Sequence, residues 1–261
     1  MPLGWATDLA ILELTGSTVV DRGDHLVVRT PGNPDYHWGN CLLVTDRSAV
    51  GDVNRWIETF HSSVPEATWI TIGLPVMPAN TDAWASRGVE LEQLDVLATR
   101  HLPRTAPLAE GYVARLLTDD DWDAVTAADL EDNARTGEYD PVIHERFVRE
   151  TNATRQRLCA QGDAAWFGVF AGSRLVSDLG IVRCGSIGRY QAVRTDPEHR
   201  RRGLSSHLLG VAGAWSAERG CDEWVTVTES TNDAGRVYRR AGFVLDEAEV
   251  NAYRPPLLTS A

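Results

Sequence analysis

The chain has 261 residues, a formal net charge of -12 and 43% hydrophobic residues, and this length predicts two domains, because a single domain usually holds roughly 100–150 residues. Nothing in the sequence approaches the roughly 20 consecutive apolar residues that cross a bilayer, which argues against a membrane-spanning protein. The chain contains no lysine, which excludes Schiff-base chemistry and a Walker-type phosphate loop, and its acidic charge disfavours nonspecific binding to nucleic acid.

The N-terminal residues show no basic cluster ahead of an apolar run, so no secretory signal is visible and a cytoplasmic location is expected. The four cysteines are scattered, without a CxxC pair or histidines at zinc-ligand spacing. We therefore expect reduced thiols and no metal site.

The first half alternates short apolar runs with longer helical patterns, which is typical of mixed α/β layers. Strands are expected at residues 25–29, 41–45, 69–74 and 91–99, and helices at 49–62 and 81–87. The segment 101–110 has two prolines and few bulky apolar residues, which indicates a linker. We accordingly expect one domain at residues 1–104 and a second at 110–256.

The second half begins with an expected strand at 112–117, and Thr118 with three following aspartates forms a favourable start for a helix that runs to about residue 132. Pro141 opens another helix toward residue 160. The remaining strands are expected at 165–170, 174–182, 190–195 and 224–228, with helices at 204–219 and 233–240 and a terminal strand pair.

The most informative segment is residues 192–209, which joins an expected strand to an expected helix. A helix N-terminus offers unpaired backbone N–H groups and the positive end of a dipole to a phosphate. Gly203 would allow the backbone to approach that anion closely. Three consecutive arginines add positive charge, although a solvated helix start would show the same arginines.

This segment resembles motif A of the GNAT superfamily of acyl-CoA N-acyltransferases, (Arg/Gln)-x-x-Gly-x-(Gly/Ala), with Ser205 in place of the last small residue. The resemblance implies a mixed, mostly antiparallel sheet with flanking helices, and acetyl-CoA as cosubstrate. It implies that backbone groups from Arg201 to Ser206 bind the pyrophosphate and that the strand edge pairs with pantetheine. The residues implied in cofactor binding are Val193, Arg194, Thr195, Arg200, Arg201, Arg202, Gly203, Leu204, Ser205, Ser206 and Asn232.

Residues 232–243 resemble motif B of the same family, an Asn followed by a short helix with Tyr and then Gly-Phe. The resemblance implies that Asn232 bonds the cofactor arm and that Tyr238 protonates the departing thiolate. An ordinary core aromatic ahead of a glycine C-cap is the alternative for Tyr238. For the general base, Glu229 at a strand end is the first candidate, with a merely solvated carboxylate as its alternative, and Asp178 is the second.

The two halves share landmarks, which predicts an internal repeat. Residues 44–46 parallel 194–196, residues 69–72 parallel 224–227, and Trp84 with Gly88 parallels Tyr238 with Gly242. Thr45 and Trp69 are 24 positions apart whereas Thr195 and Trp224 are 29 apart, so the first half is about five residues short where the pyrophosphate loop would lie. We expect a degenerate GNAT-like first domain that does not hold CoA.

The predicted function is transfer of an acetyl group to a primary amine of a small molecule or peptide. A noncatalytic acyl-CoA-binding sensor or scaffold is the alternative, and a nucleic-acid module using residues 200–202 is opposed by the net charge. The expected partners are acetyl-CoA and an amine acceptor, with neither nucleic acid nor a membrane, and a homodimer is a further possibility.

Overall fold

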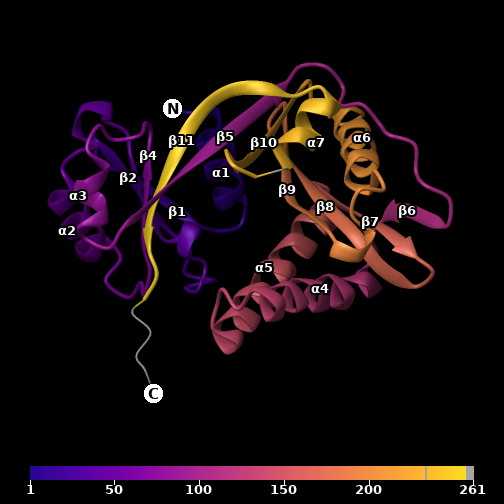
Figure 1. The fold of residues 1–261 in the computed structure, drawn as a ribbon, viewed down its shortest axis with the longest axis horizontal. Coiled ribbons are helices and arrows are strands. Elements are labelled where there is room, and N and C mark those ends of the chain that lie inside the picture. The colour runs from indigo at the N-terminus through magenta and orange to yellow at the C-terminus, as the bar shows by residue number, and fades with distance from the viewer. Residues whose placement is uncertain (233, 257–261) are drawn as a thin grey trace. The chain divides into compact units, whose positions relative to one another are not determined.

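The computed structural model describes residues 1–232 and 234–256. The chain divides into two compact units: unit 1 comprises Met1–Val96 with the described residues from Glu247 onward, and unit 2 comprises Leu97–Asp246. Both boundaries fall inside strands, so strands β5 (Glu90–Thr99) and β11 (Val244–Arg254) contribute residues to both units. Figure 1 shows the elements of each unit.

Unit 1 is a twisted sheet with helices packed against it. Its other elements are α1 (Leu3–Leu14), β1 (Thr18–Asp21), β2 (His25–Arg29), η1 (His37–Gly39), β3 (Cys41–Val44), η2 (Arg47–Ala49), α2 (Val53–Ser63), β4 (Ile70–Leu74) and α3 (Thr81–Ala85). The strand order is β1-β2-β3-β4-β11-β5. Strands β2 and β3 are antiparallel, whereas β3 and β4 are parallel and are joined through α2.

Helix α1 was not anticipated from the sequence, because its almost wholly apolar run has no amphipathic period to reveal it. Trp5, Leu9 and Leu12 are buried in a cluster with Leu26 and Val28 of β2. The helix is therefore an internal element of unit 1.

Unit 2 has the same kinds of element in a longer arrangement. They are β6 (Tyr112–Leu116), η3 (Asp119–Asp121), α4 (Trp122–Thr136), α5 (Pro141–Gln161), β7 (Ala164–Ala171), β8 (Arg174–Cys184), β9 (Ile187–Thr195), η4 (Pro197–His199), α6 (Leu204–Ala217), β10 (Glu223–Glu229) and α7 (Ala234–Ala241). The expected helix 233–240 is thus confirmed from Ala234, and position 233 lies outside the described residues.

The unit 2 sheet has the strand order β5-β10-β9-β8-β7-β6. Its pairs from β6 to β9 are antiparallel, and β9 and β10 are parallel. Helices α4 and α5 cover one face, and α6 lies on the other (Figure 1). Leu179 and Ile181 of β8 are buried in one core with Leu208 and Leu209 of α6, which fixes α6 beside the end of β9.

The last strand is a correction to the expected terminal strand pair. A single strand, β11, runs from Val244 to Arg254, and its C-terminal part pairs with β4 of unit 1, with Val250 opposite Leu74. Conversely, β10 of unit 2 has β5 as its neighbour. Strand β11, which follows the last helix of unit 2, thus pairs in the sheet of unit 1, and β5, which follows the last helix of unit 1, is the neighbour of β10. A division of the chain at residues 104 and 110 does not describe this exchange of strands.

The segment expected to be a linker packs closely on α6. A Cβ built on Gly210 would lie 2.5 Å from the Cα of Thr105, and one built on Gly213 would lie 3.0 Å from the Cδ of Pro103. The Nδ1 atom of His207 and the carbonyl of Ala106 are 2.8 Å apart. Gly210 and Gly213 have no side chain, so the backbone of residues 103–106 can lie directly against α6. The segment expected to be a linker is therefore packed as part of unit 2.

Candidate active site

Strand β9 carries a bulge near its C-terminal end. The register with β8 shifts between Asp178 and Gly180, so Ala192 and Val193 together face the single residue Leu179. Ala192 has φ of 48°, in the left-handed region that non-glycine residues rarely adopt. A bulge of this kind bends the strand and redirects its backbone groups.

Beside the bulge, β9 and β10 part from each other. Their parallel pairing covers three positions and ends with Val225 opposite Arg189. Strand β9 continues to Thr195 and β10 to Glu229, and within these fully described strands no further β9–β10 pairing follows. The edge of β9 that faces this opening therefore presents backbone groups outside the ladder.

The turn after β9 leads into the N-terminus of α6. Asp196 caps the short helix η4 by accepting from the N–H of Glu198, and Arg201 then adopts a φ of 61°. Gly203 is the N-cap residue of α6 with φ of 76°, and no side chain caps this helix. The first-turn N–H groups and the positive end of the helix dipole are thus available to an anion.

Ser205, which departs from the family motif, has a structural part in this turn. Its hydroxyl lies 2.6 Å from that of Thr195 at the end of β9. The Thr195 hydroxyl in turn lies 2.8 Å from that of Ser177 on β8. This chain of hydroxyl groups holds the start of α6 against the strand, which an alanine or glycine could not do.

The corresponding turn of unit 1 starts alike and ends differently. Asp46 caps the short helix η2 by accepting from the N–H of Ser48, just as Asp196 caps η4. Helix α2, however, has Asp52 as its N-cap, whose carboxylate accepts from the N–H of Arg55. A negative charge therefore already lies at the helix end where unit 2 has an uncapped glycine.

The structure brings residues 193–195 and 200–206 together at one corner of unit 2, but their side chains point to different partners. Arg194 forms an ion pair of 2.5 Å with Asp178. Arg200 donates from Nε to the carbonyl of Thr195. Leu204 is buried in the core beneath α6, so only its backbone can face the turn.

Tyr238 of α7 is buried, and its ring packs edge to face with Phe243 at 6.2 Å. Its hydroxyl shares a hydrogen bond with the side chain of Thr226 on β10. Burial raises the pKa of Tyr238 above its ordinary value, against the opposing effects of Thr226 and Arg189. The phenol is therefore protonated at neutral pH, as a general acid must be. Thr226 could not be found from the sequence, because it depends on how α7 lies on β10.

Asn232 lies between β10 and α7. Its carboxamide oxygen accepts from the N–H of Ala234 at 2.9 Å, which satisfies a donor at the start of α7. This bond orients the carboxamide of Asn232 at the start of α7. The cofactor contact implied by the resemblance thus stays a prediction.

The two carboxylates considered as bases have opposite surroundings. Glu229 is exposed at the end of β10. Side chains alternate along a strand, so Glu229 lies on the face opposite to Thr226 and Tyr238. Asp178 is 2% exposed and lies next to the β9 bulge.

Asp178 faces α4 and α5, because its charge interacts with Asp129 and Arg155 of those helices as well as with Arg194. Burial raises the pKa of Asp178 to about 6, although Arg194 opposes this effect. The ion pair with Arg194 is therefore a charged contact inside the unit, on the same face as Glu229.

Other chemistry is weakly supported. The described residues hold no group of three or more His, Cys, Asp or Glu side chains that could bind a metal ion. Burial raises the pKa of Cys41 to about 12 and that of Cys159 to about 11, so neither is a thiolate nucleophile at neutral pH. Among the described helices, none is long and apolar enough to cross a membrane.

A sequence profile of the acetyltransferase (GNAT) family matches residues 128–243. Residues 128–243 are a GNAT acetyltransferase domain. This stretch contains α5, the β9 bulge, the start of α6 and Tyr238, so the family match covers the corner described above. The GNAT domain makes the chain an acyltransferase. No curated protein shows significant sequence similarity to the chain.

Solved structures share the fold of the whole chain. A functionally unknown conserved protein from Staphylococcus epidermidis has a TM-score of 0.68 at 11% identity, covering 93% of this chain and 96% of that one. A GCN5-related N-acetyltransferase from Kribbella flavida has a TM-score of 0.60 at 15% identity, covering 97% of each chain. A tandem GNAT protein from the clavulanic acid biosynthesis pathway has a TM-score of 0.55 at 16% identity, covering 94% and 85%. The fold therefore fits two GNAT-type units in one chain.

The buried carboxyl of Asp178 predicts a pH-dependent stability. Its pKa is raised from 3.8 to about 6, so its contribution is fully present below pH 3.8 and is lost as the pH rises through 6. One pKa unit corresponds to about 1.4 kcal/mol. We expect the unfolding free energy of the wild type, relative to Asp178→Asn, to fall by about 2 kcal/mol from pH 4 to pH 7 in urea titrations. A constant difference between the wild type and Asp178→Asn across this pH range would contradict the burial argument.

Proposed function

We propose that the chain is an N-acetyltransferase that moves the acetyl group of acetyl-CoA directly to a primary amine of a small molecule or peptide. The observation that carries this proposal is the uncapped N-terminus of α6 at the point where β9 and β10 part. A helix end without a side-chain cap is an anion site, and the adjacent opening offers a strand edge to an extended arm.

The turn from Arg201 to Ser206 fits a pyrophosphate. Two residues in it, Arg201 and Gly203, have positive φ, which turns successive backbone N–H groups toward the helix end. No atom closer than 4.0 Å would meet a Cβ at Gly203, so this position is open. Arg200, Arg202 and the remaining backbone donors would add to the attraction for the anion.

The edge of β9 at Val193 to Thr195 fits the amide groups of pantetheine, with Asn232 across the opening. A backbone N–H near Val193, beside the bulge, would donate to the thioester carbonyl and so stabilise a developing oxyanion. Acetyl-CoA supplies the activated acetyl group when bound. The chain itself supplies orientation, the oxyanion donor and the proton transfers.

In the proposed reaction the amine nitrogen forms a bond to the acetyl carbon, and the carbon–sulfur bond breaks. Tyr238 donates its proton to the departing thiolate, which its raised pKa permits. Glu229 removes one proton from the incoming ammonium, and the second proton that the nitrogen loses as it becomes an amide passes to the Tyr238 phenolate, which restores the acid. These two groups lie on opposite faces of the parted strands, so acid and base would act from different sides of the thioester.

We further propose that unit 1 does not hold acetyl-CoA. Helix α2 carries the Asp52 carboxylate at its N-terminus, which would repel a pyrophosphate. Trp84 stands where unit 2 has Tyr238 in the repeat, and its ring nitrogen donates to the carbonyl of Val50. Unit 1 would then be a degenerate copy that completes the fold without taking part in the chemistry.

The first prediction concerns Gly203. Gly203→Asp should weaken acetyl-CoA binding by about 10- to 100-fold, because its carboxylate would face the pyrophosphate. Gly203→Ala is the control, because it adds the same Cβ and backbone strain without the charge. Arg201→Ala removes one exposed side chain and should weaken acetyl-CoA binding by about threefold or less. Calorimetric dissociation constants for acetyl-CoA would test this order. Equal losses for Gly203→Asp and Arg201→Ala would indicate recognition by side chains instead of the backbone.

Tyr238→Phe should lower kcat by about 100- to 10,000-fold with little change in the Kd for acetyl-CoA, because it removes the proton donor. It also breaks the hydrogen bond with Thr226, which costs about 1–3 kcal/mol of stability. Thr226→Val breaks the same bond and keeps the phenol, so it controls for stability. If both variants turned over at similar rates, Tyr238 would have a packing role only.

The identity of the base is tested by the pH dependence of the variants. We expect Glu229→Gln to lower kcat/KM by about 100-fold near pH 7. This loss should shrink as the pH approaches the pKa of the acceptor amine, since the amine is then neutral without a base. Asp178→Asn is the comparison, and a loss with this pH signature in Asp178→Asn, but not in Glu229→Gln, would assign the base to Asp178.

A further inference from the structure

A pair of charged residues closes the C-terminal side of the β9 bulge. Asp178 of β8 lies directly opposite Arg194 of β9, and Ser177 lies opposite Thr195. Asp178 is 2% exposed, and its carboxylate forms an ion pair of 2.5 Å with the guanidinium of Arg194. The regular ladder therefore resumes after the bulge at a buried ion pair between the two strands.

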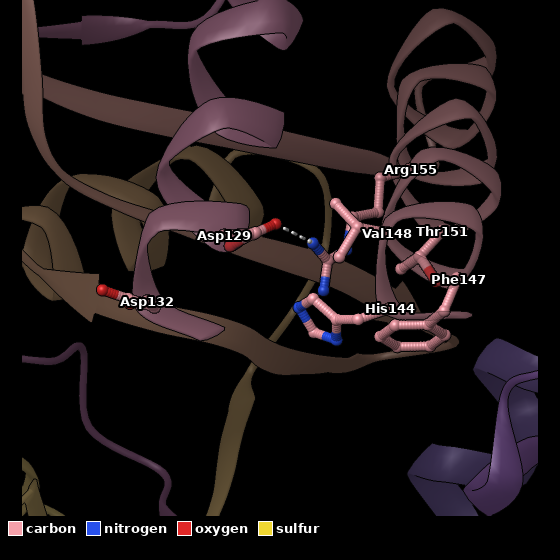
Figure 2. A pocket seen from close by; sticks show the side chains of 7 residues that line it. All are labelled: Asp129, Asp132, His144, Phe147, Val148, Thr151 and Arg155. Carbon is pink, nitrogen blue, oxygen red and sulfur yellow. Dashed lines mark ion pairs between the residues drawn. The ribbon is translucent and has the colours of Figure 1, made fainter. Parts of the chain in front are cut away.

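Arg194 is the cation that contacts Asp178. The charge of a second arginine, Arg155 of α5, also acts on Asp178. Arg155 pairs at 3.7 Å with Asp129 of α4, which the dashed line in Figure 2 marks. Loss of the Arg194 side chain would therefore remove the partner that directly offsets the charge of Asp178.

This ion pair contributes little to stability. Burial raises the pKa of Asp178 to about 6, so its ionisation at neutral pH lowers the free energy of unfolding. Within the part of the chain that the structure describes, the buried Nε of Arg194 has no hydrogen-bond partner. Such a pair is often no more stabilising than two well-packed apolar side chains. The charges at these two positions therefore need a reason other than stability.

The register of the two strands supplies that reason. Gly180 pairs with Gln191. A regular antiparallel ladder continued from this pair would place Arg194 opposite Ser177. A slip of one residue moves side chains to the other face of a sheet. Arg194 would then face α6, toward the apolar core that contains Leu208.

The bulge avoids this burial. It lets Val193 pack against the core beneath α6 while Arg194 lies on the face of Asp178. The regular register would bury the guanidinium away from its carboxylate, which is costly. It would also break the bonds of the Ser177 hydroxyl to the Arg194 carbonyl and the Thr195 hydroxyl, but each such bond contributes less than a buried charge costs. Arg194 is therefore the stronger constraint on the register.

The corresponding strands of unit 1 have the regular register. Residues 44–46 parallel 194–196 in the repeat, so Val44 stands at the position of Arg194. Val44 is buried and lies opposite His25. The described pairing of β2 with β3 runs from His25 to Val28 without a register shift. The unit with an apolar residue at this position thus has a regular ladder, as the register argument expects.

Resting on the proposed acetyltransferase function, we propose that the Asp178–Arg194 ion pair fixes the bulge at Ala192 and thereby positions the oxyanion donor near Val193. Asp178 and Arg194 are positioning residues, because they act through the backbone of β9 and not by touching the thioester. A donor of this kind stabilises an oxyanion only when its direction is fixed before the reaction.

The test replaces the pair by apolar side chains in the double variant Asp178→Leu/Arg194→Met. We expect it to melt at or above the wild-type temperature and to lose the positive φ of Ala192, since the regular register no longer buries a charge. Backbone chemical shifts and the HN–Hα coupling of Ala192 report φ in protein without acetyl-CoA. Arg194→Met alone repeats the test if the double variant does not fold.

The second measurement is the infrared carbonyl frequency of acetyl-CoA labelled with ¹³C at the thioester carbon. On the wild type, a hydrogen bond from the N–H near Val193 should lower this frequency below that of free acetyl-CoA. On the double variant saturated with acetyl-CoA, the shift should be lost. A merely structural role of the pair would change the melting temperature and leave this frequency unchanged.

Two further variants are controls. Arg194→Lys keeps the charge, so it should keep both the positive φ of Ala192 and the carbonyl shift. Arg115→Gln breaks the ion pair of 2.6 Å between Arg115 of β6 and Asp121, which lies outside the β8–β9 pairing. It should lower the melting temperature while both signals at the bulge stay as in the wild type.

A positive φ at Ala192 in the folded double variant would overturn the proposal, because the pair would then not fix the bulge. A lost φ with an unchanged carbonyl shift would overturn the positioning of the donor. Failure of the wild type to bind acetyl-CoA would contradict the proposed function, and the positioning role with it. The φ of Ala192 is measured without acetyl-CoA, so failure of the register argument is distinguishable from failure of the proposed function.

Discussion

The separation of β9 from β10 is the constraint on which the rest of unit 2 depends. The two parallel strands are joined at Arg189 and Val225 and then part, and the bulge at Ala192 bends β9 at this point. Backbone groups that leave a ladder must find other partners or remain at a surface. The core beneath α6 and the hydroxyl bond between Thr195 and Ser205 hold this arrangement open. The proposed anion site, strand edge and acid would therefore lie at one corner of unit 2.

The two units share one plan and differ at the N-terminus of one helix. Both have an aspartate-capped short helix after a strand, followed by a longer helix that leads to a parallel strand. In unit 1 the longer helix is capped by Asp52, and in unit 2 it begins at Gly203 without a side-chain cap. A cap stabilises a helix by about 1 kcal/mol. Unit 2 forgoes that stabilisation where a phosphate can supply the missing charge.

The faces of the unit 2 sheet are electrostatically distinct. The face toward α6 and α7 is apolar and holds Tyr238 with its hydroxyl bonded to Thr226. The face toward α4 and α5 holds the Asp178–Arg194 ion pair and the neighbouring charges of Asp129 and Arg155. Burial of a carboxylate is costly unless it is paired. Such a charge network is maintained at a cost in stability.

The sequence by itself determined the elements of unit 2 from β6 to α7 and the identity of the family, because strand and helix periods, a glycine at a helix start and the Tyr-to-Gly spacing are local properties of the chain. It did not reveal α1, whose apolar run has no period, or the packing of Thr105 on Gly210. Only the tertiary structure decided three further features. They are the exchange of β5 and β11 between the units, the contact of Thr226 with Tyr238, and the ion pair of Asp178 with Arg194. Strand neighbours and register are set by contacts between residues far apart in the chain, and no local pattern records them.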